Sequence, residues 1–173
     1  HTVEFQYDDE GNRARIIDPE NNQWNFAYDS SGNLTTFTDA TGNPLGLTYN
    51  SLHLPTTLTD PCSNVSTLSY DIDGNVETIT NALNQTSSFT YDAAGRVLTE
   101  TNPLTETTTY TYDAMGNRMS MTDDLSNSWT WTHDANGRAL TETDPNNYTT
   151  TYTYDLFGRL TLITDHLGNE IET

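Results

Sequence analysis

A chain of 173 residues is long enough for one domain or for one segment of a repeat array. It carries 25 acidic and six basic residues, has no lysine, and has a formal net charge of −19. This balance excludes nucleic acid as a partner, because phosphate binding needs a basic face. Membrane insertion is excluded as well, because no apolar run approaches the length of a transmembrane segment.

A ring-bearing residue followed by Asp or Asn recurs every 21 residues along the whole chain. The recurring position is occupied by Tyr7, Tyr28, Tyr49, Tyr70, Tyr91, Tyr112, His133 and Tyr154. Copies in register without insertion or deletion are the signature of a repeat architecture. We therefore expect a single array over residues 1–173, with eight copies of 21 residues, truncated at both ends.

Each copy begins with a strand that leads into the tyrosine, as in Ser128–His133, where side chains of two kinds alternate. A turn of the form Asp-x-x-Gly follows, which we call the first turn. Asp92–Gly95 suits a type I turn closing into a G1 bulge, because glycine accepts positive φ without penalty. The glycines of the first turns are Gly11, Gly32, Gly74, Gly95, Gly116, Gly137 and Gly158.

The next strand, such as Arg159–Thr164, leads to a second turn that opens with Asp or Asn and often continues with Pro, as in Asp18-Pro19. Each copy is thus one β-hairpin joined to the next by another tight turn. The predicted fold is all-β, a meander of about 16 strands forming a spiralling, solenoid-like sheet without helices or an internal domain boundary.

Alternation along the strands separates two faces of the predicted sheet. Trp129, Trp131 and His133 share one face, whereas threonine and serine occupy the other. Large exposed apolar patches usually mark contacts. We therefore expect the aromatic face to be covered by the curl of the sheet, by other copies of the chain or by further repeats.

The third copy departs from the pattern. His53 stands where the other copies have glycine, and Pro55 stands where the next strand should begin. Proline removes a ladder donor from a strand. We expect a bulge or a locally loosened hairpin at this copy.

Repeats of the form Tyr-Asp-x-x-Gly-Asn/Arg at this spacing resemble YD repeats, which occur in Rhs proteins, shell subunits of insecticidal toxin complexes, bacterial wall-associated proteins and teneurins. The resemblance covers the entire chain. It implies a long spiralling β-sheet that forms a hollow shell in the toxins and part of an adhesion ectodomain in the animal members. Nothing in this chain resembles the region with autoproteolytic aspartates that ends the family's shells, so a capsule is implied for a parent protein at most.

No set of residues converges on a catalytic site. His1, His53, His133 and His166 are scattered, and no Gly-x-Ser-x-Gly motif is present. A nucleophile at Cys62 paired with His53 is the alternative, against an ordinary thiol beside Pro61. We expect the chain not to be an enzyme.

One first turn resembles part of a calcium loop. Asp71, Asp73 and Asn75 place alternate oxygens around a glycine, but the twelfth position of an EF-hand loop, which needs an acidic ligand, is Ala82. Turn capping by these side chains is the favoured interpretation. We expect no cofactor, with calcium as the open alternative.

These observations favour a non-enzymatic structural segment of a secreted bacterial protein that builds a β-shell or an extracellular fibre, in the extracellular space or at the cell surface. Its partners would be further repeats of a parent chain or other copies of itself. The alternative is an adhesion module whose aromatic rows bind carbohydrate or a cell-surface protein.

Overall fold

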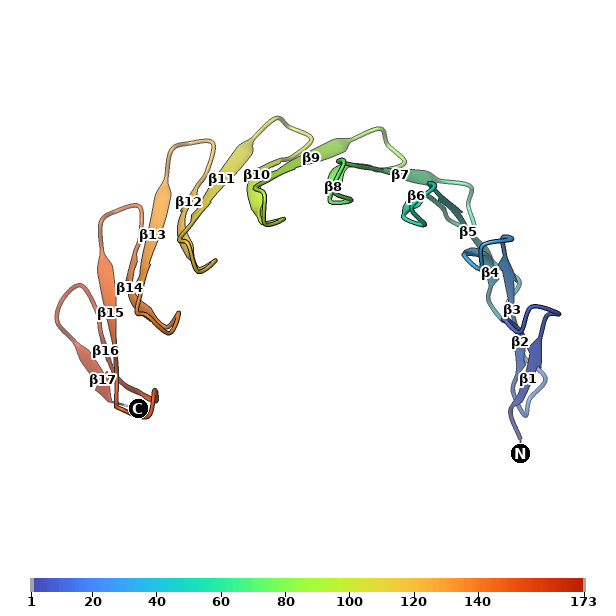
Figure 1. Cartoon of the computed structure of the whole chain (residues 1–173), viewed down its shortest axis with the longest axis horizontal. Coiled ribbons are helices and arrows are strands. Elements are labelled where there is room, and N and C mark those ends of the chain that lie inside the picture. Colours follow the sequence, from blue (N-terminus) through green and yellow to red (C-terminus); the bar gives the residue numbers. More distant parts are fainter. Residues whose placement is uncertain (1, 173) are drawn as a thin grey trace. The chain divides into compact units, whose positions relative to one another are not determined.

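The computed structural model describes residues 2–172, and every regular element in that range is a β-strand. Two compact units divide the chain, His1–Ser87 (unit 1) and Ser88–Thr173 (unit 2), and the division falls inside strand β9 (Thr86–Tyr91). Within each unit the hairpins follow one another in chain order (Figure 1). None of the described residues belongs to a helix long and apolar enough to cross a membrane.

Unit 1 is an antiparallel meander in which each strand from β1 to β8 pairs with the next. Its strands are β1 (Glu4–Tyr7), β2 (Arg13–Ile17), β3 (Gln23–Tyr28), β4 (Leu34–Thr38), β5 (Pro44–Tyr49), β6 (Pro55–Thr59), β7 (Val65–Tyr70) and β8 (Val76–Thr80).

Unit 2 repeats the same arrangement, with antiparallel pairs in sequence from β9 to β17. Its further strands are β10 (Val97–Thr101), β11 (Thr107–Tyr112), β12 (Arg118–Thr122), β13 (Ser128–His133), β14 (Ala139–Thr143), β15 (Thr149–Tyr154), β16 (Leu160–Thr164) and β17 (Glu170–Glu172). The all-β meander of hairpins is thus confirmed. Residues 2–172 form 17 strands rather than 16, because β17 opens a further copy.

Neither unit has an interior. No residue among 2–172 is fully buried, whether apolar or polar. Apolar side chains on the aromatic face are half-buried only by their cross-strand neighbours, as in the Phe26–Phe37 pair, whose ring centroids lie 5.3 Å apart. Such pairs contribute about 0.2–1 kcal/mol each, so the array is stabilised by many small repeated contacts.

The opposite face carries rows of hydroxyl groups. Thr90 and Thr99 lie in register on neighbouring strands with their hydroxyl oxygens 2.7 Å apart, and Thr132 and Thr141 repeat this arrangement at 2.6 Å. Cross-strand threonine pairs are a favourable combination in sheets. The predicted separation of aromatic and hydroxyl faces therefore holds in the structure.

A second bulge, which the sequence pattern did not reveal, follows each first turn. The pairing shifts by one residue just inside the second strand, so that Arg118 pairs with Tyr112 but Ser120 pairs with Thr111. In the third copy, Thr56 and Thr57 both bond to the hydroxyl of Thr48, so two successive side chains share the hydroxyl face. Each hairpin therefore contains one extra, unpaired residue in its second strand, and this residue is part of the 21-residue period.

Candidate functional site: the tyrosine latch and the two rows of turns

The first turns have the geometry that the Asp-x-x-Gly pattern predicts. In the fifth copy, Gly95 N–H donates to the Asp92 carbonyl at 3.0 Å, Asp92 N–H donates to the Arg96 carbonyl at 2.9 Å, and Gly95 has φ of +75°. Asp92 Oδ1 also accepts the N–H groups of Ala94 and Arg96. The aspartate therefore caps its own turn, and the type I turn with a G1 bulge is confirmed.

Capping lowers the pKa of the turn aspartates. The largest effect is at Asp39, where hydrogen bonds from the Asn43 backbone and from the Thr41 and Asn43 side chains lower the carboxyl pKa to about 2. At Asp92 the main cause of the lowered pKa is the hydrogen bond from the Arg96 side chain. Donors that point at a carboxylate favour its charged form.

The second turns have the same backbone but mostly lack glycine. The residue at the left-handed position is Asn, Ser or Thr in most copies: Asn21, Ser63, Asn84, Thr105, Ser126 and Asn147, with φ between 60° and 69°. Asn and Asp tolerate this region, whereas β-branched residues do not. Thr105, with φ of 69°, is the β-branched residue among these six, so its backbone is the most strained of the set.

Of the two expectations for the third copy, the bulge is present, but the hairpin is not loosened. His53 takes φ of 62° and its N–H donates to the Asn50 carbonyl at 3.1 Å, which is the bond that glycine makes in the other copies. Pro55 begins β6 and pairs with Tyr49. The bulge between Thr48 and Tyr49 is the one present in every copy, so His53 and Pro55 fit the common frame.

The repeated tyrosine has a role that its place on the aromatic face did not reveal. Its hydroxyl donates to the backbone carbonyl 15 residues earlier, at the first residue of a strand in the preceding copy. The bonds are Tyr28 to Arg13 (3.1 Å), Tyr49 to Leu34 (2.8 Å), Tyr70 to Pro55 (2.6 Å), Tyr112 to Val97 (2.9 Å) and Tyr154 to Ala139 (2.9 Å).

This tyrosine latch ties together strands at the end where no turn connects them. β2 and β3 are joined by a second turn at one edge, and their ladder ends at Arg15 and Asn25. The Tyr28 hydroxyl then reaches the start of β2 at the open end. The sequence contained a signal for this role. Seven of eight copies keep tyrosine, and hence a hydroxyl, at the latch position, whereas the position two residues before the tyrosine varies among residues such as Phe26, Leu47 and Trp131.

Arginines reinforce the same edge in unit 2. Arg96 forms an ion pair with Asp92 at 2.6 Å, donates from Nη1 to the Asp113 carbonyl at 3.1 Å, and lies 4.8 Å above the Tyr112 ring. Arg138 pairs with Asp134 and covers Tyr154 in the same way. A cation over an aromatic ring is attracted by the ring's negative face. Arg96 therefore bridges two successive first turns, and Arg138 links its own turn to the tyrosine of the next copy.

These bridges restrict the glycine that follows. A Cβ at Gly158 would lie 2.9 Å from Arg138 Nη1, and a Cβ at Gly137 would lie 2.9 Å from Asn117 Oδ1. Gly137 and Gly158 thus serve two needs, namely positive φ and room for the side chain of the preceding copy.

The calcium candidate is built like every other first turn. Asp71 Oδ1 accepts the N–H groups of Asp73 and Asn75, and Asp71 Oδ2 accepts the Asn75 amide. These bonds lower the Asp71 pKa, with the Asn75 side chain as the main cause. Within residues 2–172 no three His, Cys, Asp or Glu side chains are arranged to hold a metal ion. Calcium binding by Asp71, Asp73 and Asn75 stays a prediction to be tested.

The structure does not bring the catalytic alternative together. His53 belongs to a first turn and Cys62 to a second turn, at opposite ends of β6. The ring nitrogen Nδ1 of His53 lies 3.0 Å from the Asn33 side chain, and the Cys62 thiol is exposed. A nucleophile and its base must lie within hydrogen-bond reach, so this pair does not form a site.

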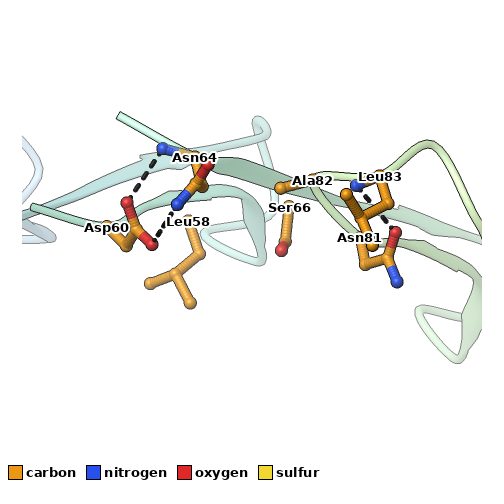
Figure 2. Close-up of a pocket in the computed structure, with 7 residues that line it drawn as sticks. All are labelled: Leu58, Asp60, Asn64, Ser66, Asn81, Ala82 and Leu83. Carbon is orange, nitrogen blue, oxygen red and sulfur yellow. Dashed lines mark hydrogen bonds between the residues drawn. The ribbon is translucent and has the colours of Figure 1, made fainter. Parts of the chain in front are cut away.

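A groove of about 440 Å³ lies between two second turns of unit 1. Figure 2 shows its lining: Asp60 is bonded twice by Asn64, Asn81 caps its own turn at Leu83, and Leu58 extends from the strand. Asp60 is the single carboxylate in the lining, and its oxygens are already occupied. The groove is a gap between repeated turns without a pair of groups for acid–base chemistry.

The aromatic face combines rings with charged groups in unit 2. Arg118 lies 4.3 Å above the Trp131 ring, and the Tyr152 hydroxyl donates to Glu142 at 3.2 Å. Burial, and then the Glu142 charge, raise the pKa of Tyr152. The Arg118 guanidinium occupies one face of Trp131, a ring that the carbohydrate alternative would use.

The RHS Repeat family profile matches residues 28–61, 70–107, 91–128 and 133–170, which together make up most of the chain. The chain belongs to the RHS repeat family. The matched segments contain the tyrosine latches of β5, β11 and β15. No curated protein matches the chain.

Solved structures share the fold of this RHS repeat chain. A Photorhabdus luminescens Tc holotoxin pore with a mutated TccC3 matches with a TM-score of 0.68 and 22% identity, covering 83% of this chain and 9% of that one. The crystal structure of TcdB2-TccC3-TEV matches with a TM-score of 0.68 and 18% identity over 95% of this chain and 12% of that one. TcdB2-TccC3 matches at 0.54 and 19% identity, over 94% and 11%. The chain therefore spans about a tenth of the length of these proteins.

Proposed function

We propose that this chain is a non-enzymatic structural segment of a secreted bacterial RHS repeat protein, in which successive hairpins build a β-shell or an extracellular fibre. The observation that carries the proposal is the tyrosine latch. The most regular polar side chains of the chain are used to bind one copy to the next, as Tyr112 binds Val97 and Arg96 binds Asp113.

The absence of an interior supports the same role. Residues 2–172 bury no side chain completely, so the array depends on neighbouring copies for its stability. Arrays of this kind gain stability by adding repeats, because each new copy adds an interface as well as its own contacts. The Tc toxin structures with the same fold are assemblies in which this length is a small part, which favours a segment of a larger shell.

The proposal is tested by joining two copies of the array head to tail so that the 21-residue step continues through the junction. A scaffold should continue as one sheet, with a higher unfolding midpoint than the single array and one elongated or curved particle by electron microscopy. A matched tandem with one extra residue at the junction should lose this gain, because a one-residue slip moves every side chain to the other face. Equal unfolding midpoints for the single array and both tandems would contradict the proposal.

An adhesion module for carbohydrate or a cell-surface protein is the second candidate, favoured by the rings and carboxylates that share the aromatic face of unit 2. A glycan array tests the carbohydrate form of this candidate. Binding should quench tryptophan fluorescence, and the quenching should be lost in Trp129→Ala but kept in Trp24→Ala, which lies in unit 1. No bound glycan and unchanged fluorescence would leave the scaffold role as the better account.

A further inference from the structure

The two rows of turns in unit 2 differ in charge. The first turns hold four aspartates, and all four arginines of the unit lie in or directly beside them, three in ion pairs. The second turns, at 102–106, 123–127, 144–148 and 165–169, hold Glu106, Asp123, Asp124, Asp144 and Asp165 without any lysine or arginine. The first-turn edge of unit 2 is therefore neutral, and the second-turn edge is acidic.

Both edges present apolar side chains at the third residue of a turn. On the second-turn edge, Leu125 is 76% exposed and Leu167 is 73% exposed; on the first-turn edge, Met115 is 64% exposed and Phe157 is 87% exposed. The turn backbone that carries them is fixed, since the N–H groups of Met115, Phe157 and Leu167 each donate to the aspartate of their own turn. Little backbone freedom would be lost on binding.

The spacing of these side chains is the same on the two edges. Leu125 and Leu167 are separated by two full copies, and so are Met115 and Phe157. Two copies correspond to four strands, or about 19 Å across the sheet. Because one period governs both edges, the two leucines are separated by the same number of strands as Met115 and Phe157.

We propose that the second-turn edge of unit 2 docks on the first-turn edge of unit 2 in a second copy of this chain, with Leu125 and Leu167 against Met115 and Phe157. Charge favours this combination over a contact between two second-turn edges. Two second-turn edges would repel each other, whereas the neutral first-turn edge accepts an acidic neighbour and offers Arg159, whose side chain is 77% exposed, to it.

The contact is heterologous, because each copy keeps one free edge of each kind, and it leads to side-by-side arrays. It is small compared with stable interfaces, so the association is weak and is favoured by salt, which screens repulsion between chains of net charge −19. It is separate from the continuation of strands in the proposed function. An array that extends end to end but shows no lateral contact would keep that function and reject this inference.

Disulfide trapping tests the contact in the full chain carrying Cys62→Ser. Leu125→Cys is mixed with Met115→Cys, or with Phe157→Cys, under oxidised glutathione, and mixed dimers are measured by mass spectrometry. One of the two mixtures should form mixed dimers at least about tenfold faster than the control mixture of Leu125→Cys with Ile72→Cys, a first-turn residue of unit 1 that is more exposed than Met115 or Phe157.

The second anchor gives an independent check. Adding Leu167→Ser to Leu125→Cys should slow trapping about tenfold, because one of two buried apolar contacts is lost. Adding Leu83→Ser, on a second turn of unit 1, should leave the rate unchanged. Mixed dimers no faster than the control, or Leu125→Cys homodimers formed as quickly as mixed dimers, would overturn the inference.

Discussion

At the scale of single residues, the repeat is maintained by groups that reach from one copy to the next. The Tyr112 hydroxyl and the Arg96 guanidinium both end on backbone carbonyls of a neighbouring copy. Backbone carbonyls are present whatever the side chain, so the acceptor can vary from Arg13 to Pro55 without losing the bond. This explains why seven of eight copies keep the tyrosine donor while the acceptor residue varies.

Removing one latch hydroxyl should weaken the array. Tyr112→Phe is expected to lower the free energy of unfolding by about 0.5–1.5 kcal/mol, the usual net value of one hydrogen bond. Tyr148→Phe is the control, because Tyr148 is half-exposed and stacks through its ring on His166. Urea unfolding measures both. A Tyr112→Phe variant as stable as the unmodified chain would show that the latch contributes nothing.

Relieving backbone strain should have the opposite effect. Thr105→Gly is expected to raise the free energy of unfolding by about 0.5–1 kcal/mol, because release of the left-handed strain exceeds the added freedom of the unfolded chain. Asn147→Gly should gain less, since Asn accepts the left-handed region more readily. Thermal unfolding of the two variants decides the point, and a larger gain at Asn147 would contradict the assignment of strain to Thr105.

At the scale of the element, each turn is a self-contained unit in which an aspartate, or in some copies an asparagine such as Asn50, accepts the backbone N–H groups of the same turn. At turn 39–43, Asp39 accepts from Thr41 and from both the backbone and the side chain of Asn43. The turn therefore needs the carboxylate in its charged form. Because first and second turns share this arrangement, the turns of both kinds that carry an aspartate depend on pH in the same direction.

The turn at 39–43 should lose stability in acid. The pKa of Asp39 in the folded chain is about 2, below its ordinary value near 4, so the unfolded chain binds the proton more readily. Its contribution is present above about pH 4 and is lost as pH falls towards about 2. Asp39→Asn should therefore be less stable than the unmodified chain at pH 7, and the difference in melting temperature should shrink between about pH 4 and about pH 2. A difference that is constant with pH would contradict this.

The calcium candidate makes an element-scale prediction too. Calcium needs six to eight oxygen ligands, whereas the Asp71 oxygens already accept three hydrogen bonds within the turn. Calcium and magnesium at equal millimolar concentration should therefore shift the melting temperature equally, by screening alone. A shift with calcium only, removed by chelation and by Asp73→Asn, would instead establish a calcium site at Asp71, Asp73 and Asn75.

At the scale of the whole molecule, the fold is a one-layer array in which length, rather than a core, provides stability. No side chain of the described residues is fully buried, and each strand pair repeats the same few contacts. The stability of such an array is a sum of contributions from single copies and from the interfaces between neighbouring copies. A whole copy can therefore be removed, whereas a change of register between copies would disrupt the interfaces.

Removing one full copy should therefore be tolerated. Deleting residues 113–133 joins Tyr112 to Asp134 and restores a Tyr-Asp turn, so the β-sheet circular dichroism should be kept with a small fall in melting temperature. Deleting residues 113–132 removes one residue fewer and places His133 between them. That variant should lose its cooperative transition, because the register is broken. Equal behaviour of the two deletions would refute the dependence on register.

The sequence by itself determined the period, the hairpins, the first turns and the family, because these depend on local residue choices that recur in register. Gly95 at positive φ and Asp92 as its cap follow from four consecutive residues. Only the tertiary structure decided what the Tyr112 hydroxyl binds, that His53 and Thr105 adopt the glycine conformation, and that a second bulge follows each first turn. Those features depend on how neighbouring strands are placed, and strand placement is set by pairing between copies rather than by any one copy.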